Sequence, residues 1–192
     1  AAIGGKDSMS GTFLDKDVPP TLISFAIAPI DKKQVLTPEF KEAGNSVYLF
    51  APTDDNAESL KKTWETFHKL HTEGKVKSAW AVERGIGEAV MKMSFGNHIG
   101  FKSCAQLGEN WHLPFYGFLV AELTEEVNIP GVKKIGITTI EEEICLENDC
   151  ASIDELYNLN AQVLEDVYPT KTVEKIVEIP SLDFADKSNL TP

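Results

Sequence analysis

The order of short apolar runs and capped helices constrains the fold of this chain more than any other feature of its sequence. Runs rich in β-branched and aromatic residues predict strands at 21–29, 46–52, 75–82, 115–123 and 132–140, and residues 144–146 could pair beside them. With the helical patterns, the predicted order is β, β, α, β, α, β, β, α. Some strands are chain neighbours and others are separated by helices. This order therefore favours an α+β domain with a mixed sheet packed by helices over a doubly wound parallel sheet.

Capping residues and apolar periodicity define the helices. Asp55 with Glu58, and Ser152 with Glu155, have the spacing of a capping box, and a further helix is predicted over 85–95. We expect one face of each helix to be buried. The buried faces are Leu60, Trp64, Phe67 and His71 in the first helix, Ile86, Val90 and Met93 in the second, and Leu156, Leu159, Val163 and Val167 in the third. Pro38 also predicts a helical turn over 38–42, and the strand at 21–29 is expected to be buried on both faces.

The balance of charge limits the partners of the chain. Eighteen Lys and Arg residues stand against thirty Asp and Glu residues, which gives a formal net charge of -12. That sign disfavours binding to nucleic acid or to an anionic membrane. No apolar run approaches the roughly 18 residues of a membrane-spanning helix. We therefore expect a cytoplasmic protein with neither a nucleic-acid nor a membrane partner.

The cysteines and acidic residues give no recognisable metal or catalytic pattern. Cys104, Cys145 and Cys150 are odd in number and lack CxxC spacing, so neither a disulfide framework nor a four-ligand zinc site is indicated. We expect reduced, structural thiols. The acidic run at 141–143, with Glu147 and Asp149, could bind a hard cation, but it has no calcium-loop pattern and is interpreted as a solvated edge.

Two histidines have the spacing of candidate metal ligands. His68 and His71 lie three residues apart on the first predicted helix, a spacing that can bind a metal. No third ligand follows in a recognisable pattern, and His71 continues the apolar face of the helix. The sequence therefore predicts no metal site and no catalytic residue.

One segment has the composition of an anion-binding loop. The chain opens with Gly4, Gly5, Lys6, Asp7, Ser8, Met9 and Ser10. Glycines allow backbone N–H groups to approach a ligand, a lysine can neutralise a phosphate, and hydroxyl groups can bond phosphate oxygens. The segment is not a Walker loop, and a solvated turn is the alternative interpretation. The nucleotide- or phosphate-binding candidates are Gly4, Gly5, Lys6, Asp7, Ser8 and Ser10.

Three strings together resemble a known enzyme family. They are AIGGKDSMSGTF at the start, VPPTLISFAIAP with VLTPEF after it, and KVKSAWAVERGIGEAVMKMSFGNHIG further on. The chain resembles the large, single-chain form of phosphoribosylformylglycinamidine synthase from residue 1 to about residue 169. In that family the GKDSMS string ends the second AIR-synthetase-like N-terminal subdomain, and the matching C-terminal subdomain follows.

The resemblance implies a function only for a longer protein. The whole enzyme would use ATP, magnesium and glutamine to convert formylglycinamide ribonucleotide into formylglycinamidine ribonucleotide. It implies three regions here: 1–20 as the end of the N-terminal subdomain, 21–169 as the AIR-synthetase-like C-terminal subdomain, and 170–192 as a linker toward a glutaminase domain. The chain starts inside a motif and without Met. We therefore expect a fragment that is inactive alone and holds no tightly bound cofactor.

A second family motif is altered in this chain. Many members read SAHDxSDGG, with the first Asp on magnesium and the Ser near an auxiliary nucleotide, whereas residues 78–86 here read SAWAVERGI. Ala81 replaces the metal carboxylate and Glu83 replaces the Ser. We expect the auxiliary cavity to be empty or structural, filled by Trp80 or by an ion pair between Glu83 and Arg84.

Partners and alternatives follow from the same resemblance. The expected partners are the remaining subdomains of the same polypeptide, including a glutaminase, and a small ribonucleotide substrate. Exposed apolar surface on an isolated piece could also lead to a homodimer. The alternative function is a stand-alone, non-catalytic binding or assembly domain of the AIR synthetase family. AIR synthetase and selenophosphate synthetase themselves match less well, because the KDSMSG motif is typical of the longer synthase.

Overall fold

The chain consists of two units, divided between Val35 and Leu36, in a computed structural model that describes residues 11–17, 25–104 and 111–170. In the first unit, β1 (Thr12–Phe13) pairs antiparallel with β2 (Lys16–Asp17), and a 3-10 turn at Lys32–Gln34 is capped by the Asp31 carboxylate. The second unit carries the folded core. The expected assignment of 1–20, 21–169 and 170–192 to family subdomains stays a prediction.

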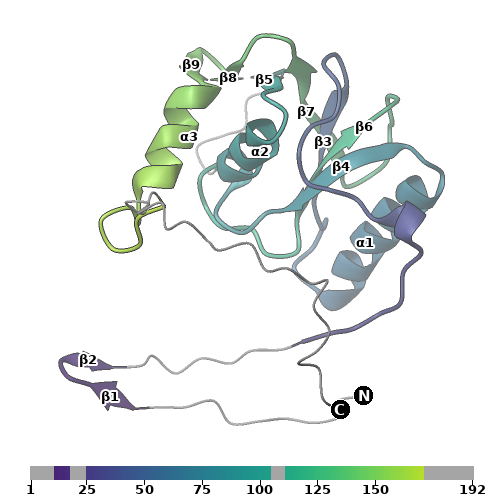
Figure 1. The fold of residues 1–192 in the computed structure, drawn as a ribbon. Helices are drawn as coiled ribbons and strands as arrows, with labels where there is room; N and C mark the ends of the chain where they lie inside the picture. The colour runs from purple at the N-terminus through teal and green to yellow at the C-terminus, as the bar shows by residue number, and fades with distance from the viewer. Residues whose placement is uncertain (1–10, 18–24, 105–110, 171–192) are drawn as a thin grey trace, which may run out of the picture. The chain divides into compact units, whose positions relative to one another are not determined.

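A seven-stranded mixed sheet forms the centre of the second unit (Figure 1). Its strands lie in the order β4-β6-β3-β7-β5-β8-β9. Their bounds are β3 Ser46–Phe50, β4 Val76–Ala81, β5 Gly100–Ser103, β6 Leu119–Leu123, β7 Val132–Thr139, β8 Glu143–Leu146 and β9 Asp149–Ser152. All neighbours pair antiparallel except β5 and β8, which are parallel. The α+β class with a mixed sheet is thereby confirmed.

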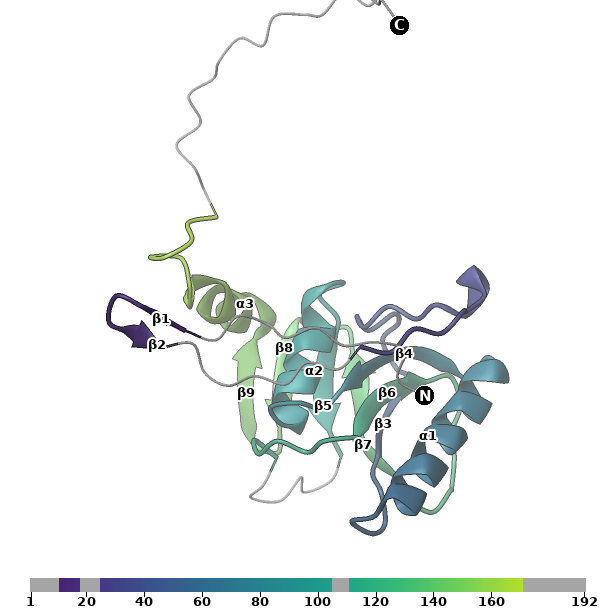
Figure 2. The ribbon, with the colours of Figure 1, turned by 90° about the horizontal axis from the view of Figure 1, so that it is seen from below.

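Three helices cover the two faces of this sheet (Figure 2). They are α1 (Ala57–Thr72), α2 (Ile86–Phe95) and α3 (Ile153–Gln162). Alternate residues of β3 face opposite sides: Val47 and Leu49 join the core under α2, whereas Tyr48 and Phe50 join the core under α1. Because both faces of β3 are buried, this strand reads as a continuous apolar run and was predictable from sequence.

A buried carboxylate fixes the segment that leads into β3. Glu122 of β6 is fully buried and accepts hydrogen bonds from the Lys41 and Glu42 backbone N–H groups, the Asn45 side-chain amide and the Ser78 hydroxyl. These four donors compensate the cost of burying the carboxylate. The network holds residues 41–45 in an irregular conformation, so the helical turn predicted over 38–42 is wrong.

The strand predicted at 21–29 is also wrong in the part that the structure describes. Residues 25–30 have no regular secondary structure, and Phe25 and Ile27 are 86% and 97% exposed. Residues 21–24 lie outside the described residues. A strand is stable only when a neighbour satisfies its backbone groups, and 25–30 has no such neighbour among the described residues.

Two predicted helix faces differ from those observed. The N-cap of α1 is Asn56 rather than Asp55, and Trp64 is 49% exposed, with its indole N–H donating to the Gly117 carbonyl at 3.0 Å. In α3, Ser152 caps the helix as predicted, but only Ile153 is buried. The expected core residues Leu159, Val163 and Val167 are exposed. Within the described residues, no helix has the length and apolar character that crossing a membrane would require.

Candidate functional site

The loop singled out by the sequence lies outside the described residues. Gly4, Gly5, Lys6, Asp7, Ser8 and Ser10 are therefore given no geometry, and their role as nucleotide- or phosphate-binding residues stays a prediction. The described second unit offers a different candidate, a pocket that sequence reasoning did not find.

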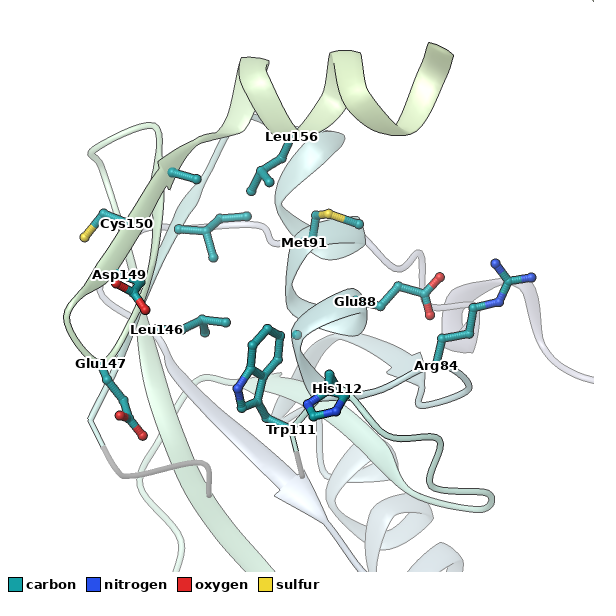
Figure 3. Close-up of a pocket in the computed structure, with 13 residues that line it drawn as sticks. Arg84, Glu88, Met91, Trp111, His112, Leu146, Glu147, Asp149, Cys150 and Leu156 are labelled. Atoms are coloured by element: carbon teal, nitrogen blue, oxygen red, sulfur yellow. The ribbon is translucent and has the colours of Figure 1, made fainter. Parts of the chain in front are cut away.

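This pocket has a volume of about 930 Å³ and lies between α2, the β8–β9 hairpin, the start of α3 and the Trp111-His112 segment (Figure 3). Its volume is within the range of small-molecule sites. Apolar side chains from α2, β8, α3 and the segment at Trp111 line its floor, namely Met91, Trp111, Ile144, Leu146 and Leu156. Charged and polar side chains surround this floor, namely Arg84, Glu88, His112, Glu147 and Asp149.

Two glycines allow Trp111 to form one wall of the pocket. A Cβ atom on Gly87 would lie 2.3 Å from Cζ3 of the Trp111 ring, and one on Gly85 would lie 2.7 Å from the Trp111 carbonyl oxygen. The Gly87 N–H also donates to that carbonyl at 3.3 Å. Gly85, the N-cap of α2, has φ +118, a conformation that favours glycine. The sequence Arg-Gly-Ile-Gly is therefore both a helix start and a docking surface for Trp111.

The charges around the pocket disfavour a phosphate. Arg84 projects near Glu88 at one side, while Glu147 and Asp149 lie on the β8–β9 hairpin at the other (Figure 3). Three carboxylates against one guanidinium give this rim a negative balance at neutral pH. An aromatic or aliphatic group can pack on the apolar floor, but a phosphate would meet like charges from the hairpin. The pocket thus provides apolar contact with an acidic rim.

The altered motif at residues 78–86 lies partly beside this pocket. Trp80 is half-buried and packs against the larger core, so it does not line the pocket. Glu83 and Arg84 are exposed and form no ion pair within the described residues, which corrects that expectation. Ala81 has no side-chain oxygen, so the residues present here do not fit a magnesium ion.

The histidine and cysteine expectations have separate outcomes. His71 is half-buried and stacks on Phe67, which agrees with a packing role, while His68 is exposed. Cys145 and Cys150 form a disulfide, so the expectation that all thiols are reduced is wrong in this structure. Cys104 is a free thiol and is exposed rather than buried. The five-residue separation of Cys145 and Cys150 across the Glu147-Asn148 turn is the sequence signal that could have indicated a hairpin pair.

Comparisons with known proteins agree with the fold and do not establish a family. No family model and no curated protein sequence matches the chain. The chain is similar to Thermotoga maritima PurL complexed with AMPPCP, with TM-score 0.52 and 13% identity over 81% of this chain and 32% of that chain. It is also similar to the PurLQS structure from Thermotoga maritima, with TM-score 0.52 and 12% identity over 80% of this chain and 32% of that one.

A third solved structure gives the same result. Phosphoribosylformylglycinamidine synthase II from Thermotoga maritima matches with TM-score 0.51 and 12% identity, over 80% of this chain and 31% of that chain. At these identities the likeness shows the fold alone, which this chain shares with part of the solved PurL structures. The chain spans about a third of the length of these structures.

Proposed function

We propose that this chain is one module of an ATP-using enzyme of the phosphoribosylformylglycinamidine synthase type. The observation that carries the proposal is the agreement of two independent features. The fold of PurL extends over 81% of the chain, and the chain opens with the Gly5-Lys6-Asp7-Ser8 string. The proposed reaction of the whole enzyme joins nitrogen from glutamine to formylglycinamide ribonucleotide, with ATP hydrolysed to ADP and phosphate.

Within that enzyme, the 4–10 loop is proposed to contact a phosphate. Its glycine N–H groups, the Lys6 ammonium and the Ser8 and Ser10 hydroxyls are the groups that bind phosphate oxygens. The pocket beside Trp111 does not take this role, because its rim is acidic. ATP and magnesium would be held mainly by other parts of the enzyme, and the isolated chain is proposed to be inactive.

Exposed apolar side chains support a role as part of a larger assembly. Phe25, Ile27 and Ile30 are exposed in the first unit, and in the second unit Leu159 of α3 and its C-cap residue Val163 are exposed. Large exposed apolar surface is commonly covered by another protein surface. We propose that the remaining subdomains of a longer polypeptide, including a glutaminase, cover them, and that the isolated chain can form a homodimer instead. The proposed location is the cytoplasm.

Equilibrium binding tests this function. ATP, ADP and formylglycinamide ribonucleotide would be titrated by calorimetry into the 192-residue chain and into the polypeptide encoded by the complete reading frame. We expect that only the complete polypeptide, and not the 192-residue chain, binds ATP and the ribonucleotide saturably. Tight binding of either ligand by the 192-residue chain would contradict the proposal that this chain holds only part of the binding site. Absence of ribonucleotide binding by the complete polypeptide would contradict the proposed enzyme class.

A further inference from the structure

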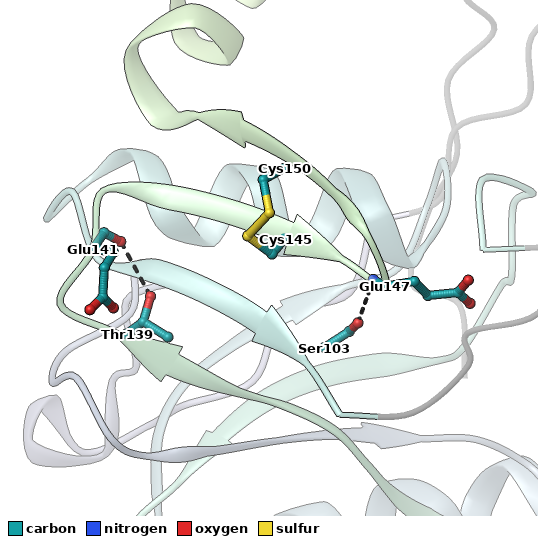
Figure 4. Close-up of a disulfide and its surroundings, with 6 residues drawn as sticks. All are labelled: Ser103, Thr139, Glu141, Cys145, Glu147 and Cys150. Atoms are coloured by element: carbon teal, nitrogen blue, oxygen red, sulfur yellow. Dashed lines mark hydrogen bonds between the residues drawn. A yellow bond between two sulfur atoms is a disulfide. The ribbon is translucent and has the colours of Figure 1, made fainter.

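Three side chains of the β8–β9 hairpin bring metal-ligating atoms together. A carboxylate oxygen of Glu143 and the sulfur atoms of Cys145 and Cys150 all lie within 4.8 Å of one another. Among the described residues this is the one group of three or more His, Cys, Asp or Glu side chains with that proximity. Figure 4 shows the two sulfur atoms joined in a disulfide across the hairpin, so that only the reduced form offers them as metal ligands.

The strand register explains why these side chains meet. Cys145 lies directly opposite Cys150, with their Cα atoms 4.1 Å apart, and Glu143 precedes Cys145 by two residues on the same strand. Residues two apart on a strand project from the same face of the sheet. Glu143 and both cysteines therefore share one face, while the intervening Ile144 is buried in the core under α2.

The cluster adjoins the pocket described above and shares Cys150 with it, while Glu143 and Cys145 are not among the residues that line the pocket. The pocket lies on the α2 side of the hairpin, where Ile144 and Ala151 line it. Figure 3 shows the Cys150 sulfur pointing away from that pocket. Glu143 and Cys150 are exposed and Cys145 is half-buried, so an ion could reach the cluster directly from solution.

We propose that, when the disulfide is reduced, Cys145, Cys150 and Glu143 bind a thiophilic divalent cation such as Zn²⁺. Thiolates are the ligands that select zinc among common divalent ions, and carboxylates complete such sites. At Zn–S distances of 2.3 Å, tetrahedral coordination places two sulfurs roughly 3.8 Å apart. Side chains in register on one face can reach that separation by rotation about χ1. A water molecule would occupy the fourth position.

The redox and proton balance of the site is simple. A phosphine and water reduce the disulfide to two thiols, and the phosphine becomes a phosphine oxide. Binding of the cation then releases the two thiol protons to solvent. Two thiolates and one carboxylate carry three negative charges, so one remains after a divalent ion binds. Lys102 is the register partner of Cys145 on β5, and its positive charge compensates this remainder.

Cobalt spectroscopy tests the site in the 192-residue chain. The chain would be reduced with a phosphine, freed of reductant without oxygen, and titrated with Co²⁺. We expect one equivalent to produce a thiolate-to-cobalt charge-transfer band, and Zn²⁺ to abolish that band by displacement. A band that is absent, or that does not saturate near one equivalent, would overturn the proposal.

Matched variants assign the ligands. Cys104→Ser removes the free thiol outside the cluster and should leave the band and the stoichiometry unchanged. Cys145→Ser should abolish one-equivalent binding. Glu143→Gln keeps both thiols but removes the carboxylate ligand. Its affinity for Co²⁺ should fall by at least roughly 10–100-fold, the loss that follows removal of a residue that only supports a metal ligand. If Glu143→Gln binds as tightly as wild type, the three-ligand site is refuted. This readout is independent of any enzymatic activity.

Discussion

The carboxylate of Glu122 accepts a hydrogen bond of 2.8 Å from the hydroxyl of Ser78, and both side chains are fully buried between neighbouring strands. Two backbone N–H groups and the Asn45 amide fill the remaining acceptor positions of the carboxylate. A buried side chain on β6, the strand next to the edge strand β4, is thus tied to the segment that enters β3. This arrangement makes Glu122 a structural residue.

Replacing Glu122 by Gln should destabilise the fold. The new NH₂ group would face donors rather than acceptors, which leaves buried polar groups unsatisfied at a cost of about 1–3 kcal/mol or more. Urea unfolding measures the loss. Glu125→Gln is the matched control, because Glu125 pairs with Lys75 at the surface and should change the free energy of unfolding by at most about 1 kcal/mol. Equal effects of the two variants would contradict the assignment.

Gly87→Ala should displace the Trp111 ring while α2 stays folded. The added methyl would overlap the ring, whereas alanine at this helical position is favoured over glycine by about 1 kcal/mol. We expect increased quenching of tryptophan fluorescence by acrylamide, a neutral quencher that is insensitive to the rim charges, with little change in circular dichroism. Glu88→Ala, on the same helix and the same pocket rim, should leave the quenching unchanged. Unaltered quenching in Gly87→Ala would show that Trp111 does not pack there.

Acid should weaken the fold partly through Glu39. Hydrogen bonds from the Lys41 ammonium and then the Thr37 hydroxyl lower the pKa of the Glu39 carboxyl from 4.5 to about 2. A depressed pKa contributes stability above pH 4.5, and that contribution is lost as the pH falls toward 2. The pair is partly exposed, so about 0.2–1 kcal/mol is expected. Glu39→Gln should remove this part of the pH dependence of unfolding. If the free energy of unfolding of Glu39→Gln falls between pH 4.5 and 2 by as much as that of the wild type, this role of Glu39 is contradicted.

Reduction of the Cys145–Cys150 disulfide in the absence of metal should lower stability. The bond closes a short loop with a sequence separation of 5, for which the chain-entropy relation gives about 2 kcal/mol. Urea unfolding with and without a phosphine measures the difference. Cys104→Ser should show the same difference as wild type. Thiol titration of the oxidised, denatured chain should count one free thiol; three would mean that the disulfide does not form.

The central elements of the fold were predictable because their signals are local. The apolar run of β3, the β-branched run of β7 and the glycine-bounded helix α2 were all found at nearly their observed positions. In contrast, β5 (Gly-Phe-Lys-Ser) and β9 (Asp-Cys-Ala-Ser) were missed. Each is four residues long and is stabilised as a strand by pairing with β7 or β8, which composition does not reveal.

The pocket was not predictable for a related reason. It depends on the docking of Trp111 against Gly87, two residues 24 positions apart in the sequence with no motif that links them. The exposed face of α3 shows the opposite case. Leu159 and Val163 have the helical spacing of core residues, but within the part of the chain that the structure describes no surface covers them. Periodicity indicates an apolar face without identifying what it contacts.

Coupled turnover by the polypeptide encoded by the complete reading frame tests the proposed function most directly. ADP and formylglycinamidine ribonucleotide would be quantified with ATP, magnesium, glutamine and formylglycinamide ribonucleotide present, and with each omitted in turn. We predict equal amounts of the two products, formed only when all four components are present, and a loss of roughly 10²-fold in Lys6→Ala. ADP formation that does not require the ribonucleotide, or full activity in Lys6→Ala, would contradict the account.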